Sequence, residues 1–240
     1  MRLLITRPEP DATRTAEALA ALGHEALVSP SLAVTLLPDV PLPRGRFQAL
    51  IATSANALRA LASHHERAMV LDLPIFTVGD QSTRQAQEAG FANAVSAEGA
   101  VDELVAMVSS RLKPEGGPIL YLAGETQAGD PAGQLEAAGF AVQTWVLYQT
   151  EPVVRLSPEA TLALRSGHID GVLLYSRKSA TAFALALRGG RLSPLPENTA
   201  IYCISEAAAE PVRRHARGPV LVAERPDGAH LFALLTAPEG

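Results

Sequence analysis

Residues 48–58 read Gln-Ala-Leu-Ile-Ala-Thr-Ser-Ala-Asn-Ala-Leu, an apolar run that ends in hydroxyl and amide side chains. Short uncharged runs of this kind are typical of strands buried on both faces, and serine is a preferred residue at the start of a helix. The stretch therefore predicts a strand, a short polar turn and a helix. In an open parallel sheet, such a turn lies at the carboxyl end of the strand, where ligands bind.

Six apolar runs end in a turn of this type. The turns lie at residues 6–8, 53–56, 78–82, 123–126, 175–179 and 204–206. Each turn opens a predicted helix, whose free N–H groups and positive dipole end attract anions. The chain thus presents many small hydroxyl and amide donors and few classical catalytic groups. This combination favours a large polyanionic small molecule as the ligand.

Predicted strands and helices alternate along the chain. Strands are expected at residues 2–6, 25–29, 48–53, 74–78, 93–95, 118–122, 141–145, 170–174, 199–204 and 219–223. Helices are expected between them, for example at residues 11–22, 176–187 and 205–216. Regular alternation of this kind predicts an α/β fold with doubly wound parallel sheets.

The pattern also repeats after about half of the 240-residue chain. Residues 48–58 match 170–180, residues 74–90 match 199–216, and residues 2–29 match 118–144. A repeat of this length indicates two similar structural units. Two α/β lobes of five strands each are therefore expected.

Two extended, proline-containing stretches interrupt the alternation, at residues 31–40 and 146–154. If they pair as a two-stranded connector, one lobe comprises residues 1–33 plus 155–240 and the other comprises 41–145. The connector strands are then 34–40 and 146–154. A division at residues 113–118, which read Lys-Pro-Glu-Gly-Gly-Pro, agrees equally well with the composition, and periodicity does not choose between the two.

The composition excludes several classes of protein. A net charge of −5 is unusual for a nucleic-acid binder, and the basic run at residues 213–217 is interpreted as the solvated end of a helix. No uncharged stretch is long enough to span a bilayer, and the amino terminus has no signal-peptide core. The single cysteine, Cys203, lies in an apolar strand pattern, which predicts a buried thiol and a cytoplasmic protein.

Known cofactor and metal motifs do not occur in the sequence. It has no G-x-G pair, no phosphate-binding G-x-x-x-x-G-K loop and no G-x-S-x-G nucleophile elbow. The six histidines show no ligand spacing, and the side chains of adjacent His64 and His65 would diverge on a helix. We therefore expect neither a nucleotide nor a metal, which argues against a two-lobed transferase.

Several turn residues are candidates for binding an anionic ligand. Arg7 follows the first strand, so it is either a carboxylate clamp or a surface residue at a helix start. Ser54 and Ser176 are most simply helix N-caps, but they also lie at the edge where ligands bind.

Two further features are of interest. Gly79 would let the backbone approach a carboxylate closely, with Ser82 and Thr83 supplying hydroxyls to form an anion-binding nest. Tyr148 lies on the suspected connector, where it either packs for stability or donates a proton or hydrogen bond.

In their order and spacing, these motifs resemble the uroporphyrinogen-III synthase family over nearly the whole chain. The resemblance is carried by residues 4–8, 53–57, 78–83, 89–91, 147–150, 175–180 and 204–205. It implies two flavodoxin-like, doubly wound parallel-sheet lobes joined by a two-stranded connector. This arrangement favours the discontinuous division of the chain given above.

The resemblance also implies an activity. Family members are lyases that cyclise linear hydroxymethylbilane, an octacarboxylate, to uroporphyrinogen III, with inversion of ring D and loss of water. The reaction belongs to tetrapyrrole biosynthesis, which supplies haem, sirohaem, cobalamin and chlorophyll, and it uses no cofactor or metal. The family's connector tyrosine aligns with Tyr148, the expected catalytic residue. Its hydroxyl residue after the turn glycine falls on Ser82, beside Thr83.

The substrate-binding residues expected on this basis share the six strand-end turns. They are Arg7, Thr53, Ser54, Asn56, Gly79, Ser82, Thr83, Gly124, Ser176, Arg177, Ser179 and Ser205. A hinged two-lobe enzyme can act as a monomer, and a small-molecule substrate is the only partner expected. The alternative interpretation is a non-enzymatic two-lobed protein that binds a small molecule.

Overall fold

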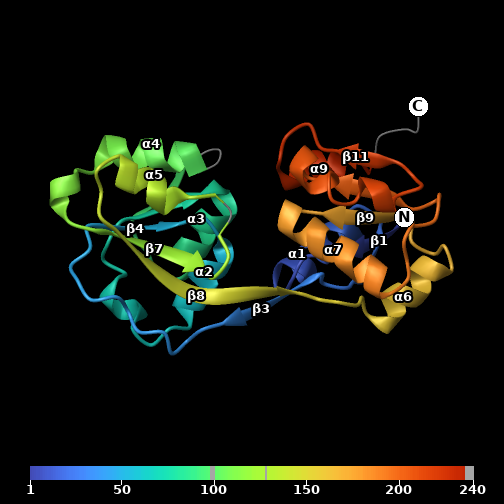
Figure 1. Ribbon diagram of the computed structural model, residues 1–240, viewed down its shortest axis with the longest axis horizontal. Coiled ribbons are helices and arrows are strands. Elements are labelled where there is room, and N and C mark those ends of the chain that lie inside the picture. Colours follow the sequence, from blue (N-terminus) through green and yellow to red (C-terminus); the bar gives the residue numbers. More distant parts are fainter. Residues whose placement is uncertain (98–100, 128, 236–240) are drawn as a thin grey trace. The chain divides into compact units, whose positions relative to one another are not determined.

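The computed structural model describes residues 1–97, 101–127 and 129–235, apart from the side chain of Asp80. The chain divides into two compact units (Figure 1). The first unit combines Met1–Ala33 with Glu151–Gly240, and the second unit is the continuous segment Val34–Thr150.

The first unit contains a parallel sheet of five strands within the described residues. In chain order its strands are β1 (Arg2–Ile5), β2 (Glu25–Val28), β9 (Gly171–Leu174), β10 (Ala200–Cys203) and β11 (Val220–Val222). Their spatial order is β2-β1-β9-β10-β11, which is the 2-1-3-4-5 order of flavodoxin-like folds.

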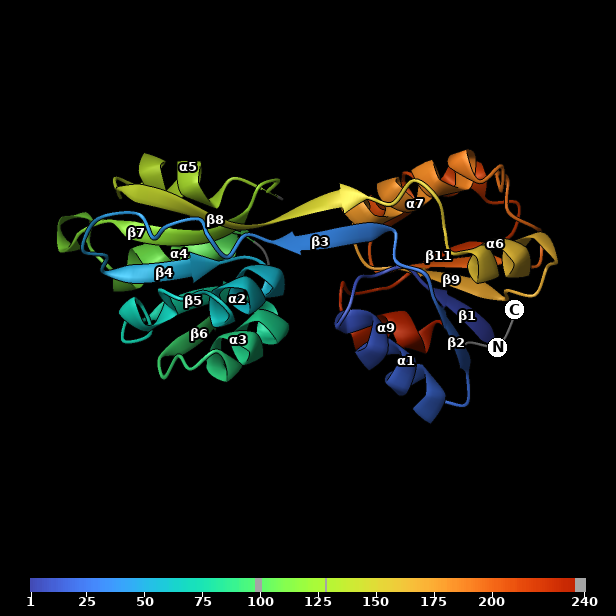
Figure 2. The same cartoon turned by 90° about the horizontal axis from the view of Figure 1, so that it is seen from below.

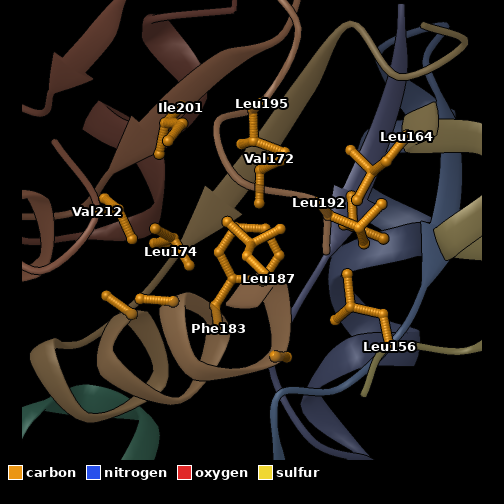
Figure 3. Close-up of a cluster of buried hydrophobic side chains, with 14 of the residues drawn as sticks. Leu156, Leu164, Val172, Leu174, Phe183, Leu187, Leu192, Leu195, Ile201 and Val212 are labelled. Carbon is orange, nitrogen blue, oxygen red and sulfur yellow. The ribbon is translucent and has the colours of Figure 1, made fainter. Parts of the chain in front are cut away.

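Helices cover both faces of this sheet (Figure 2). One face carries α1 (Asp11–Ala21) and α9 (Gly228–Ala233), and the other carries α6 (Pro158–Arg165), α7 (Arg177–Gly189) and α8 (Glu206–Ala209). Successive strand residues point to opposite faces, so both helical layers have an apolar surface to pack on. Figure 3 shows this on the α7 side, where Phe183 lies among Val172, Leu174 and Leu187.

The second unit contains a sheet of six strands within the described residues. In chain order its strands are β3 (Leu32–Leu36), β4 (Ala49–Ala52), β5 (Ile75–Val78), β6 (Ala94–Ala97), β7 (Ile119–Gly124) and β8 (Val142–Pro152). The spatial order is β3-β8-β7-β4-β5-β6, and the ladders from β8 to β6 are parallel.

Two pairs of helices cover the second sheet. Helices α2 (Ala55–Ala62) and α3 (Gly79–Glu88) pack on one face, and α4 (Val101–Arg111) and α5 (Pro131–Ala137) pack on the other. Figure 1 shows α4 and α5 side by side. The described residues of this unit also contain two 3-10 turns, Arg67–Met69 and Pro114–Gly116.

The two sheets share one strand order, although the chain enters them differently. In the sequence repeat, β1 and β2 correspond to β7 and β8, and β4, β5 and β6 correspond to β9, β10 and β11. If β7 and β8 are counted as strands 1 and 2, and β4, β5 and β6 as strands 3, 4 and 5, the order β8-β7-β4-β5-β6 is again 2-1-3-4-5. Each half of the chain therefore contributes its first two strands to one sheet and its last three strands to the other.

Strands β3 and β8 form the two-stranded connector. Both cross the boundaries between the units, and they are neighbours in the sheet. The Leu37 N–H donates to the Leu147 carbonyl at 2.8 Å, and the Val153 N–H donates to the Ser31 carbonyl at 2.9 Å, which is an antiparallel register. The strand expected at residues 141–145 and the extended stretch at 146–154 are thus one long strand.

The helix expected at residues 205–216 is wrong in its extent. Helix α8 ends at Ala209, and residues Arg213–His215 form a separate 3-10 turn. Pro211 lies between the two, and proline lacks the N–H that would continue the hydrogen bonding of the α-helix. Among the described residues, no helix has the length and apolar character needed to cross a membrane.

Candidate functional site

Hydroxyl groups gather at the carboxyl end of the second sheet. Thr53 and Ser54 follow β4, and each lies near a tyrosine of another strand, Tyr121 of β7 for Thr53 and Tyr148 of β8 for Ser54. The Thr53 and Tyr121 hydroxyls lie 3.0 Å apart, and the Ser54 side chain lies close enough to the Tyr148 phenol to lower its pKa. Ser54 is also the N-cap of α2, because its Oγ accepts the Asn56 N–H at 3.2 Å. The N-cap interpretation of Ser54 is therefore confirmed.

Tyr148 lies opposite Gly124 in the β7–β8 ladder, and only 8% of its surface is exposed. Burial raises the pKa of its phenol above 10.0, and the nearby Ser54 side chain opposes this shift. Burial likewise raises the pKa of Tyr121, against the lowering effect of Thr53. Both phenols are therefore protonated at neutral pH and can act as hydrogen-bond donors.

The turn after β5 places Gly79, Ser82 and Thr83 at the start of α3. Gly79 has a φ of +74°, a conformation that favours glycine. Thr83 Oγ1 lies 2.7 Å from Thr77 Oγ1 and donates to the Gly79 carbonyl at 3.2 Å, so this hydroxyl has partners within the turn. Ser82 is buried.

Arg59 was not among the residues selected from the sequence. Its Nη1 donates to Asn56 Oδ1 at 2.8 Å, and its Nε donates to Gln85 Oε1 at 2.8 Å. The guanidinium thus holds the Asn56 side chain and places a partly buried cation beside the start of α2. Arg59 lies inside a predicted helix rather than in a turn, and its i, i+3 spacing from Asn56 was the available signal.

In the first unit, Thr6 and Arg7 follow β1. The Thr6 hydroxyl donates to the Leu173 carbonyl at 2.8 Å and is fully buried. The Arg7 guanidinium lies 4.3 Å from the centre of the Tyr175 ring, and its Nη2 is 3.2 Å from Asp11 Oδ2. Arg7 therefore already has an anionic partner and an aromatic partner within this unit.

The remaining candidates of the first unit lie at the starts of α7 and α8. Ser176 caps α7 by accepting the Ser179 N–H at 3.1 Å, which confirms the N-cap interpretation, and its hydroxyl lies 3.0 Å from that of Ser179. The Arg177 guanidinium is largely exposed and pairs with Glu210 at 3.1 Å. The Ser205 side chain makes no cap hydrogen bond with α8.

The structure thus brings Thr53, Ser54, Gly124 and Tyr148 into one cluster and pairs Ser176 with Ser179. Tyr121 also belongs to the cluster around Thr53, although its position within an apolar run of the sequence did not indicate a polar role.

His64, His65 and Glu66 are close enough to be considered as metal ligands. The two rings stack at 4.6 Å, so the expectation that they diverge on a helix is wrong, because α2 ends at Ala62. His64 Nδ1 accepts the Glu66 N–H at 3.1 Å, and its Nε2 lies 3.1 Å from the Val40 carbonyl. Both ring nitrogens therefore have backbone partners, and the group is better explained as an anchor for the Val40 segment.

The comparisons with known proteins agree with this arrangement. The family model described as uroporphyrinogen-III synthase HemD matches residues 13–233. The chain belongs to the uroporphyrinogen-III synthase family. The activity of this family is the cyclisation of hydroxymethylbilane in tetrapyrrole biosynthesis, and it is the activity of this chain; the alternative of a non-enzymatic binding protein is not favoured.

Solved uroporphyrinogen-III synthases have the same fold. The chain is similar to the enzyme from Helicobacter pylori, with a TM-score of 0.65 and 18% identity over 98% of both chains. It is also similar to a mutant enzyme from the extremely thermophilic bacterium Thermus thermophilus, with a TM-score of 0.58 and 18% identity over 98% of this chain and 97% of that one. A comparison with curated protein sequences finds no match.

Proposed function

We propose that this uroporphyrinogen-III synthase uses Tyr148 to donate a proton to the substrate hydroxyl, which then departs as water. The observation that carries the proposal is the placement of the Tyr148 phenol, which is buried beside Ser54 at the carboxyl end of the second sheet. A phenol in this state keeps its proton at neutral pH, as a general acid must.

Loss of the hydroxyl leaves an electrophilic azafulvene on the linear tetrapyrrole. Attack by the substituted carbon of ring D then forms a spiro intermediate, whose rearrangement inverts that ring. The protein must fold the substrate so that this carbon, and not the unsubstituted one, reaches the electrophile. Orientation of reacting groups can supply about 7–11 kcal/mol in favourable intramolecular reactions, so positioning can account for much of the catalysis.

The carboxylates of the substrate require many anion donors rather than one strong site. We propose that the turns at the carboxyl ends of both sheets supply them, because their helix starts offer free N–H groups and hydroxyls. In the second unit the donors are Thr53, Ser54, Asn56, Gly79, Ser82 and Thr83. In the first unit they are Arg7, Ser176, Arg177, Ser179 and Ser205.

The test of the Tyr148 proposal is the Tyr148→Phe variant. We expect its kcat to fall by about 10- to 100-fold, because the substrate can lose its hydroxyl slowly without help. This loss is at or below the lower limit of the rate enhancement that general acid catalysis usually provides. The measurement follows consumption of synthetic hydroxymethylbilane and separates type I from type III product by chromatography. Wild-type turnover of this variant would remove Tyr148 from the mechanism.

We further propose that the enzyme acts as a monomer in the cytoplasm and binds no nucleic acid. The negative net charge and the single buried cysteine support this setting. Light scattering should give the mass of one chain, and a dimer mass would contradict the proposed monomer.

A further inference from the structure

Gly124 faces the catalytic candidate at very short range. It is the last residue of β7, and a Cβ atom at this position would lie 2.6 Å from Tyr148 Cζ and 2.9 Å from its hydroxyl oxygen. The φ of Gly124 is not in the left-handed region, so its backbone conformation does not require glycine. What the position requires is space for the tyrosine ring.

A bulge in the ladder places the ring there. Ala123 pairs with Val146, but the next pair is Gly124 with Tyr148, so Leu147 is skipped. Bulges re-aim the side chains that follow them. The Glu125 N–H donates to the Tyr148 carbonyl at 2.9 Å and holds the backbone immediately after the bulge.

A second residue lies near the hydroxyl of this ring. Ser54 lies close enough to the Tyr148 phenol to lower its pKa, and the position of Ser54 is set by its role as the N-cap of α2. Gly124 and Ser54 thus both lie beside the hydroxyl-bearing end of the ring. Of the two, only Gly124 acts by having no side chain.

We propose that Gly124 is a positioning residue for Tyr148: its missing side chain seats the ring so that the phenol reaches Ser54 and the reacting hydroxyl. This inference rests on the proposed role of Tyr148, and it gives Gly124 a part in the site besides the expected contact with the substrate. The end of a tyrosine side chain can swing, so an added methyl group is relieved by moving the ring rather than by unfolding the strand. Gly124→Ala should therefore impair turnover with little effect on stability.

A matched control exists in the same unit. A Cβ atom at Gly116 would lie 2.6 Å from Gln48 Oε1, which is also the end of a flexible side chain, and neither residue belongs to the proposed site. We expect Gly124→Ala to lose about 10- to 100-fold in kcat, as Tyr148→Phe does, with an unchanged KM. Gly116→Ala should keep the wild-type kcat.

Two readouts separate positioning from a general structural effect. Gly124→Ala introduced into Tyr148→Phe should add no further loss of kcat, because both changes remove the same phenol contact. In an ultraviolet titration, the transition that Tyr148→Phe abolishes should move to lower pH in Gly124→Ala, because the displaced phenol is less buried. Losses of kcat that multiply in the double variant, or an unmoved phenol transition, would overturn the inference.

The outcomes also distinguish this inference from the proposed role of Tyr148. If Tyr148→Phe turns over as fast as the wild type, that role fails, while the phenol titration still tests the seating of the ring. If Tyr148→Phe is impaired but Gly124→Ala behaves like Gly116→Ala in turnover and titration, the role stands and the positioning inference is wrong.

Discussion

The sequence predicts Arg7 as a residue that binds a carboxylate of the ligand, but in the structure its guanidinium already has partners within the protein. Its guanidinium stacks on Tyr175, which is far away in the chain, and pairs with Asp11 at the start of α1. The sequence places Arg7 correctly at a strand end, but it cannot show a partner that only the β1–β9 pairing brings near. Any substrate carboxylate at this position has to share the guanidinium with Asp11.

We expect Arg7→Ala to lower the free energy of unfolding by about 1–2 kcal/mol, from a partly buried ion pair and a cation–π contact. Urea unfolding measures the loss. The matched control is Arg177→Ala, because the Arg177–Glu210 pair is exposed on both sides and should contribute nothing measurable. Equal effects of the two substitutions would contradict the stacked arrangement.

The thiol of Cys203 should be inert in the folded protein. Desolvation raises its pKa from 9.0 to about 12. The unfolded chain therefore releases this proton first, so the thiol's contribution to stability is complete below pH 9 and is lost as the pH rises to about 12. We expect no reaction with Ellman's reagent at about pH 8 in the native protein and full reaction in denaturant. Rapid labelling of the native protein would contradict the burial.

The strands were the most predictable elements. Each of the ten expected strands overlaps a strand of the structure, because short apolar runs between polar turns have few other arrangements. Local breaks were less predictable. The helix expected at 205–216 stops because Pro211 prevents its continuation, and that signal was present in the sequence.

The clustering of several candidate site residues was predictable, but their pairings were not. Thr53, Ser54 and Tyr148 were all selected from turns and the connector, and they do lie in one cluster. The partnership of Thr53 with Tyr121 required the register of β4 against β7, which apolar patterning does not specify. The contact of Tyr148 with Gly124 likewise could not be predicted without knowing of the bulge at Leu147.

The helix starts differ in how they are capped, which gives a prediction for stability. Ser176 accepts the Ser179 N–H, whereas Ser205 makes no side-chain cap bond. We expect Ser176→Ala to cost about 1 kcal/mol and Ser205→Ala only a small fraction of this. Chemical denaturation of the two variants provides the comparison, and a larger loss for Ser205→Ala would show that the cap assignment is wrong.

At the scale of the whole molecule, the two units differ in how the chain encodes them. The second unit is a single segment, whereas the first unit needs residues from both ends of the chain. In the first unit, β9 pairs directly with β1, and α1 covers part of one sheet face. The first unit is therefore incomplete without its amino-terminal segment.

This difference predicts the behaviour of fragments. We expect residues 34–150 to fold cooperatively alone, and residues 151–240 to remain largely unfolded until a peptide of residues 1–33 is added. Circular dichroism during urea titration measures both. Cooperative unfolding of residues 151–240 without the peptide would refute the need for β1 and α1.

The divided first unit also imposes an order on synthesis at the ribosome. Residues 1–33 emerge first, yet the strand that β1 must join lies beyond the whole central segment. At about 5–20 residues per second, the 141 residues from Val34 to the end of β9 at Leu174 delay that partner by about 7–28 s. During this interval the apolar surfaces of β1 and α1 in the nascent chain remain exposed. We therefore expect a chaperone to bind the newly synthesised chain at this segment.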